Sequence, residues 1–305
     1  MGIWRTLEFE FVAMASPCAI WIDTKKEQLA RKSADAAIAE VRRIEQKYSR
    51  YQEGSVLSRI NREAANSAVA VDSETAELLN FAERLWHASG GCFDISTGVF
   101  RRIWDFRRGE LPSQSQLDAT LPCVGWPKVS WNGTHIHFAC KGMEIDFGGI
   151  GKEYAADRVA QVLRDHGFEH ALVNLGGDVH ALGARARPDG SGQPWSIGIR
   201  HPRVQEQCLA HLPLHRGGLA TSGDYERYFE RDGRRYCHIL NPLTGMPVTH
   251  WQSVSVLSAN ATSAGAMSSI AMLKEETAIA WLDAQSVSYL AVRSDGQVFT
   301  HRVAA

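Results

Sequence analysis

The sequence lacks the features that mark several common classes of protein. Lysines and arginines total 33 against 34 aspartates and glutamates, and this balance argues against a nucleic-acid partner or an anionic-membrane surface, since both require a basic excess. No apolar run is long enough for a transmembrane segment. No basic segment followed by an apolar one stands at the start, so we expect a cytoplasmic protein, or a periplasmic one if an export signal was trimmed.

Cysteine pairs and histidine clusters with metal-ligand spacing are absent as well. No two cysteines form a C-x-x-C pair, and no histidine has an acidic or cysteine partner at ligand spacing, so a zinc site is not predicted. A chain of 305 residues buries a full core without disulfides, and the scattered cysteines are therefore interpreted as reduced thiols. They are Cys18, Cys92, Cys123, Cys140, Cys208 and Cys237.

Three motifs of nucleotide-binding and hydrolytic enzymes are missing. A Walker A loop would need glycine where Asp146 stands and serine or threonine where Glu153 stands, and no G-x-G-x-x-G occurs. There is also no G-x-S-x-G elbow, so the sequence does not support a serine hydrolase.

What is present is a mixture of strand and helix patterns in ordinary globular proportions, with 44% hydrophobic and 22% charged residues. Alternation predicts strands at 7–11 and 19–23, and helical spacing predicts helices over 25–48, 73–89 and 263–274. Asn132-Gly133 predicts a hairpin with a type I′ turn. Because strands and helices do not alternate regularly and no linker is visible, we expect an α+β fold, with residues 1–305 as one domain.

The segment DFGGIGKEYAAD at 146–157 is the richest in chemistry. We expect a strand at 143–146, a glycine turn, and then a helix over 152–166. Such a turn lets backbone N–H groups and Lys152 approach a phosphate, although glycine is also used for turn geometry alone. A second glycine turn at 174–178 lies between predicted strands, and the two turns could share a pocket.

His238 ends a predicted strand directly before the turn at 241–245. Loops at such positions deliver reactive side chains, and an imidazole near its ordinary pKa takes a proton from a hydroxyl at neutral pH. The alternative is a histidine that is simply hydrogen-bonded beside a turn.

Taken in order, a series of segments resembles the ApbE family of FAD:protein FMN transferases. They are FVAMASP (11–17), SRY (49–51), SVLSRIN (55–61), FDIS (93–96), DFGGIGKEYAAD (146–157), NLGGD (174–178), SGDY (222–225), HILNPLTG (238–245) and AGAMSS (264–269). They span nearly the whole chain in the family's order.

The resemblance implies an ApbE-like, T-fold-like core of two subdomains, with FAD in the cleft between them. It also implies Mg²⁺-dependent transfer of FMN from FAD to a serine or threonine hydroxyl of an acceptor protein, with release of AMP. His238 would be the catalytic base. The implied FAD contacts are Met14, Tyr51, Cys92, Phe93, Asp94, Asp146, Lys152 and Ile239.

The resemblance is incomplete at the metal site. The family motif carries an aspartate and a threonine where this chain has Gly265 and Ser269, and Glu153 replaces a usual glycine. The metal ligands left to this chain would be Gly149, Ser268 and Ser269. Two alternatives therefore stay open: a protein that binds FAD without transferring FMN, and a pyrophosphatase that hydrolyses FAD to FMN and AMP. If the site binds Mg²⁺, Gly265→Asp is expected to tighten that binding.

Overall fold

The computed structural model describes residues 3–187 and 192–302. An eight-stranded sheet runs through it in the order β1-β2-β6-β7-β12-β15-β16-β17, with every neighbouring pair antiparallel. Its strands are β1 (Arg5–Ala13), β2 (Ser16–Thr24), β6 (Ala171–Leu175), β7 (Asp178–Ala181), β12 (Gly217–Gly223), β15 (Trp251–Ser258), β16 (Ser288–Arg293) and β17 (Val298–His301).

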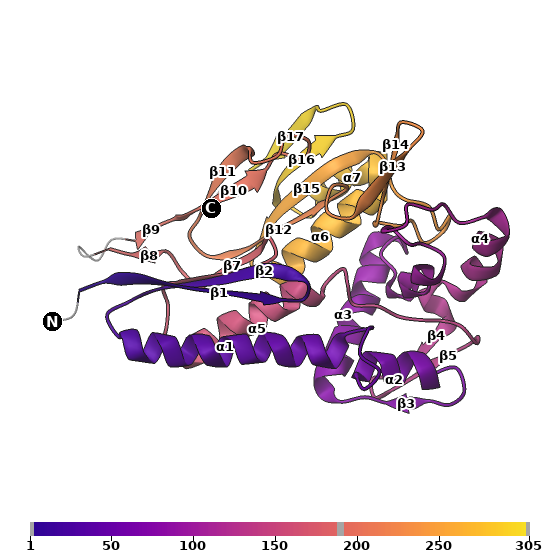
Figure 1. Ribbon diagram of the computed structural model, residues 1–305, viewed down its shortest axis with the longest axis horizontal. Coiled ribbons are helices and arrows are strands. Elements are labelled where there is room, and N and C mark those ends of the chain that lie inside the picture. Colours follow the sequence, from indigo (N-terminus) through magenta and orange to yellow (C-terminus); the bar gives the residue numbers. More distant parts are fainter. Residues whose placement is uncertain (1–2, 188–191, 303–305) are drawn as a thin grey trace.

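Alternating side chains give this sheet two covered faces. On one face Val173 packs with helices α1 (Glu27–Tyr48) and α5 (Gly151–Asp165), which lie beside one another in Figure 1. Helices α6 (Ala261–Lys274) and α7 (Ala278–Ala284) continue this layer along β12 and β15. On the other face the adjacent Leu172 packs with Trp195 of the hairpin β10 (Trp195–Arg200) and β11 (Cys208–Leu214).

A smaller part of the chain forms a second subdomain beside one end of the sheet, on the right in Figure 1. It has its own core around Leu79, Ile136 and Phe138. Its elements are α2 (Val56–Glu63), β3 (Val69–Ala70), α3 (Ser73–Ser89), η1 (Ile95–Arg102), α4 (Gln114–Thr120), η2 (Leu121–Cys123), η3 (Trp126–Lys128), β4 (Val129–Trp131) and β5 (His135–Phe138). The remaining short elements are β8 (Arg185–Ala186), β9 (Gly192–Gln193), β13 (Tyr228–Arg231), β14 (Arg234–Cys237) and η4 (Glu275–Thr277).

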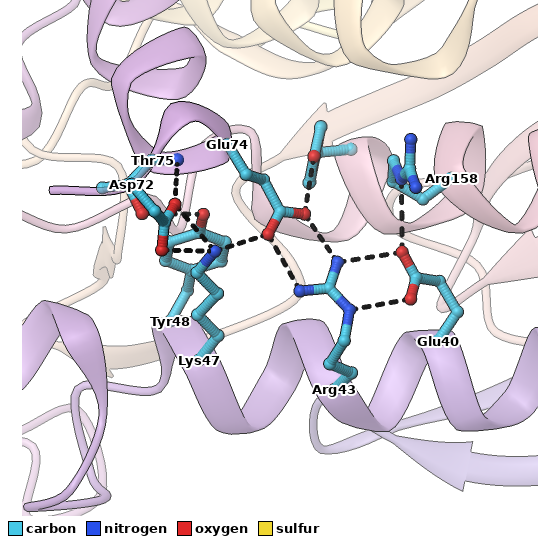
Figure 2. A network of polar contacts seen from close by, with 9 residues as sticks. Glu40, Arg43, Lys47, Tyr48, Asp72, Glu74, Thr75 and Arg158 are labelled. Carbon is cyan, nitrogen blue, oxygen red and sulfur yellow. Dashed lines mark hydrogen bonds and ion pairs between the residues drawn. The ribbon is translucent and has the colours of Figure 1, made fainter.

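Figure 2 shows the polar network that ties α3 of the small subdomain to α1 and α5. Glu74, in the first turn of α3, accepts hydrogen bonds from Arg43 and Lys47 of α1, each at 2.6 Å, and from the Tyr154 hydroxyl of α5 at 2.8 Å. Arg43 and the other donors lower the pKa of Glu74 to about 2. Three helices thus share one carboxylate, which fixes the small subdomain against the large one.

The α+β class and its two subdomains are confirmed, and so are the predicted long helices. The predicted strand at 143–146 is wrong, because Ile145 pairs through both its N–H and its carbonyl with the amide of Asn61 instead of with a strand. The hairpin at Asn132 is present, but its type I′ turn is also wrong: the loop has three residues, and only Gly133 has positive φ. No helix in residues 3–187 and 192–302 has the length and apolar character needed to cross a bilayer.

Candidate active site

A cavity of about 550 Å³ lies between the sheet and the small subdomain, which is a usual size for a ligand pocket. Loops that are distant in the sequence converge on it. Its lining includes Ala15, Ser16, Arg50, Cys92, Phe93, Asp94, Gly98, Asp146, Gly148, Gly149, Lys152, Glu153, Gly176, Asp178, Thr221, Ser222, Arg227, His238, Ile239 and Ser269.

The two glycine turns both line this cavity, so the shared pocket that the sequence left open is present in the structure. Gly176 takes a positive φ of 65° in the tight β6–β7 turn, where an added Cβ would lie 2.7 Å from Cβ of Ser16 and 3.4 Å from Nζ of Lys152. Lys152 stands in the first turn of α5, and no side chain caps that helix. The lysine and the helix N-terminus both bring positive charge to this side of the cavity, beside the carboxylates of Asp178 and Glu153.

Lys152 forms an ion pair with Asp178, whose carboxylate lies 3.3 Å away. Burial opposes the charge on the lysine, but the carboxylates of Asp178 and Glu153 raise its pKa, so it is a cation at neutral pH. Burial raises the pKa of Asp178. The lysine thus neutralises a buried carboxylate and still faces the cavity, where an anion would meet it.

A second cation enters from the small subdomain. Arg50 donates to Asp146 over 2.9 Å, and Asp146 in turn accepts from the backbone N–H of Gly148. Tyr51, by contrast, is 76% exposed and does not line the cavity; its hydroxyl accepts from Arg50, whose guanidinium lies 5.1 Å from its ring. Of these two neighbours, Arg50 lines the cavity, and the contact of Tyr51 with FAD stays a prediction.

The segment from Cys92 to Asp94 forms the opposite side. Phe93 packs so close to Gly149 that a Cβ on the glycine would lie 3.1 Å from its ring. The Asp94 carboxylate is occupied, because it accepts from Ser96 at the start of η1 and from the backbone N–H of Trp126 at 2.7 Å. Its side chain thus orders this loop, and Asp94 lines the cavity.

His238 lies in the cavity lining, on the strand-to-turn segment that follows β14. Its backbone N–H donates to the Arg227 carbonyl at 3.0 Å, and its buried Nδ1 has no partner within the described residues. Burial, reinforced by the positive charge of Arg227, lowers the pKa of His238 to about 4. The imidazole is therefore neutral at pH 7 and able to accept a proton.

Two other predicted site residues lie outside the lining. Met14 sits in the β1–β2 turn with a positive φ of 51°, and its backbone N–H donates to Glu45, while the next residues, Ala15 and Ser16, reach the cavity. Ser268 is fully buried, and its hydroxyl lies 3.0 Å from the Gly265 carbonyl.

The other predicted ligands of a metal, Gly149 and Ser269, do line the cavity. The Ser269 hydroxyl lies 3.0 Å from that of Ser222 on β12. The described ranges contain no group of three or more histidine, cysteine, aspartate or glutamate side chains arranged to hold a metal ion. A cation here would therefore be held by at most a small number of carboxylates, together with protein hydroxyl and carbonyl oxygens and oxygens of a bound substrate.

Comparison with known proteins identifies the family. A profile of the ApbE family matches residues 14–291, and this match covers every loop of the cavity. The chain belongs to the ApbE family. The ApbE protein of Thermotoga maritima has the same fold, with a TM-score of 0.89 and 30% identity over 98% of this chain and 97% of that one. The flavin transferase ApbE of Vibrio cholerae superimposes with a TM-score of 0.86 at 24% identity, over 98% of this chain and 97% of that one.

Curated relatives of this ApbE-family chain carry the name FAD:protein FMN transferase. The Treponema pallidum protein is 35% identical over 71% of this chain and 64% of its own length. The Klebsiella pneumoniae protein is 31% identical over 83% of this chain and 78% of its own length.

Sequence reasoning missed several polar residues of the cavity, among them Arg50, Glu153, Asp178 and Arg227. Arg50 and Asp178 stand inside segments that carry the family resemblance, but the resemblance assigned the FAD contacts to other residues of the family pattern. Glu153 was visible as a departure from the family pattern. Arg227 has no local signal, because only the fold brings it next to His238.

Proposed function

We propose that this chain is a Mg²⁺-dependent FAD:protein FMN transferase. The hydroxyl oxygen of an acceptor serine or threonine attacks the phosphorus of the FMN half of FAD. The new O–P bond replaces the bridging P–O bond, AMP leaves with that bridging oxygen, and the hydroxyl proton passes to His238. The names and family of the relatives support this reaction class.

One observation carries the proposal: the neutral imidazole of His238 and the cations Lys152 and Arg50 line the same cavity. His238 is positioned to accept the hydroxyl proton, while Lys152 and Arg50 are positioned for the negative charge of a diphosphate. Phosphoryl transfer depends mainly on positioning and on charge neutralisation, and this arrangement supplies both.

The residues present also fit a divalent cation. Glu153, inside the cavity, has a buried carboxylate oxygen, Oε2, without a partner in the described part of the chain, and Ser269 adds a hydroxyl. A hard cation prefers such oxygen ligands and completes its shell with waters and phosphate oxygens. When bound, Mg²⁺ would neutralise charge on the phosphates.

To test the proposal, the full chain is incubated with FAD, Mg²⁺ and a serine- or threonine-containing fragment of a flavin-accepting protein. Three outcomes can be distinguished. Flavin fluorescence on the acceptor after a denaturing gel supports transfer. Free FMN and AMP in equal amounts, without labelled acceptor, would show hydrolysis instead. Bound FAD that stays intact would show a binding protein, and either of these results overturns the proposal.

A histidine variant completes this test. His238→Ala is expected to keep FAD binding while slowing transfer by ~10²-fold or more, which is the usual effect of losing a general base. Transfer at the wild-type rate in this variant would show that another group takes the proton.

A further inference from the structure

The structure shows that Glu153 fills the space beside Gly265. A Cβ built on Gly265 would lie 2.5 Å from both Cγ and Oε1 of Glu153 and 2.7 Å from its Cδ. Such distances are shorter than any real packing contact, so the glutamate of α5 already occupies the volume that a side chain at position 265 of α6 would take. The carboxylate that Glu153 adds on α5 thus lies where the side chain missing at Gly265 on α6 would be.

The Glu153 carboxylate is poorly satisfied where it stands. The residue is 6% exposed, lines the cavity, and leaves Oε2 without a hydrogen-bond partner among the described residues. A buried, unpaired carboxylate oxygen is costly, and one that persists beside a ligand cavity points to a partner that arrives with the ligand. Its neighbour Lys152 does not fill this role, since that ammonium group forms its ion pair with Asp178.

From this geometry we propose that Glu153 supplies the carboxylate ligand of the divalent cation in this chain, replacing the side chain that Gly265 lacks. The inference rests on the proposed function, because that function brings the cation and the phosphates into the cavity. It adds a residue outside the predicted ligand set of Gly149, Ser268 and Ser269.

The two helices are held in the register that this assignment requires. Asp157, one turn after Glu153 on α5, accepts hydrogen bonds at 2.9 Å from the backbone N–H groups of Ala261 and Thr262 at the start of α6. Farther along α6, Ser269 follows Gly265 by one turn and reaches the same cavity. The carboxylate from α5 and the hydroxyl from α6 therefore face one ligand space.

The proposal is tested by measuring how tightly the full chain with FAD bound binds Mn²⁺. Electron paramagnetic resonance gives the concentration of free Mn²⁺ at each step of the titration. Glu153→Gln keeps the shape of the side chain and removes its charge. We expect it to weaken Mn²⁺ binding by at least ~10-fold, while metal-free FAD affinity stays within about twofold. Glu77→Gln, on the exposed face of α3, is the matched control and should leave Mn²⁺ affinity unchanged.

The decisive variant moves the carboxylate back to α6. Glu153→Gly combined with Gly265→Asp should restore Mn²⁺ affinity to within a few-fold of wild type. Gly265→Asp alone should fail to tighten binding, because its side chain would collide with Glu153 and add a second buried carboxylate. For this single substitution, the proposal therefore predicts the opposite of the tighter binding expected from the sequence.

Unchanged Mn²⁺ affinity in Glu153→Gln, or no Mn²⁺ binding by wild type with FAD, would overturn the assignment. If Glu153→Gln does not fold, the paired variant decides, and its failure to bind Mn²⁺ also overturns the assignment. Loss of Mn²⁺ binding in Glu153→Gln together with a wild-type protein that transfers no FMN would refute the proposed function alone. The two proposals therefore fail separately.

Discussion

The protonation of His238 is expected to depend on whether the cavity is filled. In the free protein its pKa lies at about 4, below the ordinary 6.5, first because the ring is buried and then because Arg227, Lys152 and Arg50 repel a further positive charge. This difference corresponds to roughly 3 kcal/mol in favour of the neutral ring. A diphosphate bound beside Lys152 and Arg50 would cancel much of this repulsion.

We therefore predict that FAD raises the pKa of His238 by at least ~1 unit, which makes the imidazole a stronger base when the substrate is present. The measurement is an NMR pH titration of protein with isotope-labelled histidine, with and without FAD. The His238→Asn variant identifies the resonance among the 12 histidines. A midpoint near 6.5 in the free protein, or one that FAD leaves in place, would refute the electrostatic reasoning.

The same shift predicts how stability depends on pH. Because the folded-state pKa of His238 lies below 6.5, the unfolded chain binds more protons, and wild type loses stability as the pH falls from about 6.5 to 4. His238→Asn cannot bind this proton, so its stability should fall less over this window. Urea unfolding at several pH values measures the difference, and parallel curves for the two proteins would contradict the prediction.

Two further predictions concern the framework of the site. Gly98→Ala would place Cβ 3.0 Å from Cβ of Asp146, so we expect ~1–3 kcal/mol of destabilisation and weaker FAD binding. Gly54→Ala is the matched control, because a Cβ there would have nothing within 4 Å. Equal melting temperatures for the two variants would contradict this prediction. Glu74 has a folded-state pKa of about 2 against 4.5, so its contribution to stability is present above pH 4.5 and is lost as the pH falls toward 2. Glu74→Gln should therefore destabilise the protein at pH 7 and progressively less at pH 4 and 3 in urea unfolding, and an equal effect at all three pH values would contradict this.

The sequence by itself predicts the features that depend on short stretches of chain. Periodicity is local, so the helices over 25–48 and 73–89 and the glycine turns were predictable, and the ordered segments were sufficient to identify the family resemblance. Lys152 and His238 were found in the same way, because each stands beside a turn whose residues give a clear signal.

Only the tertiary structure decides which side chains share a space. The Asn61 amide replaces a strand partner for Ile145, and the Asp94 carboxylate is already occupied by a backbone N–H from a distant segment. The position of Glu153 beside Gly265 is of the same kind, since 112 positions separate them in the sequence and a packed pair of helices joins them. Such contacts arise from long-range packing, which no local pattern encodes, and they determine where this chain places its carboxylate.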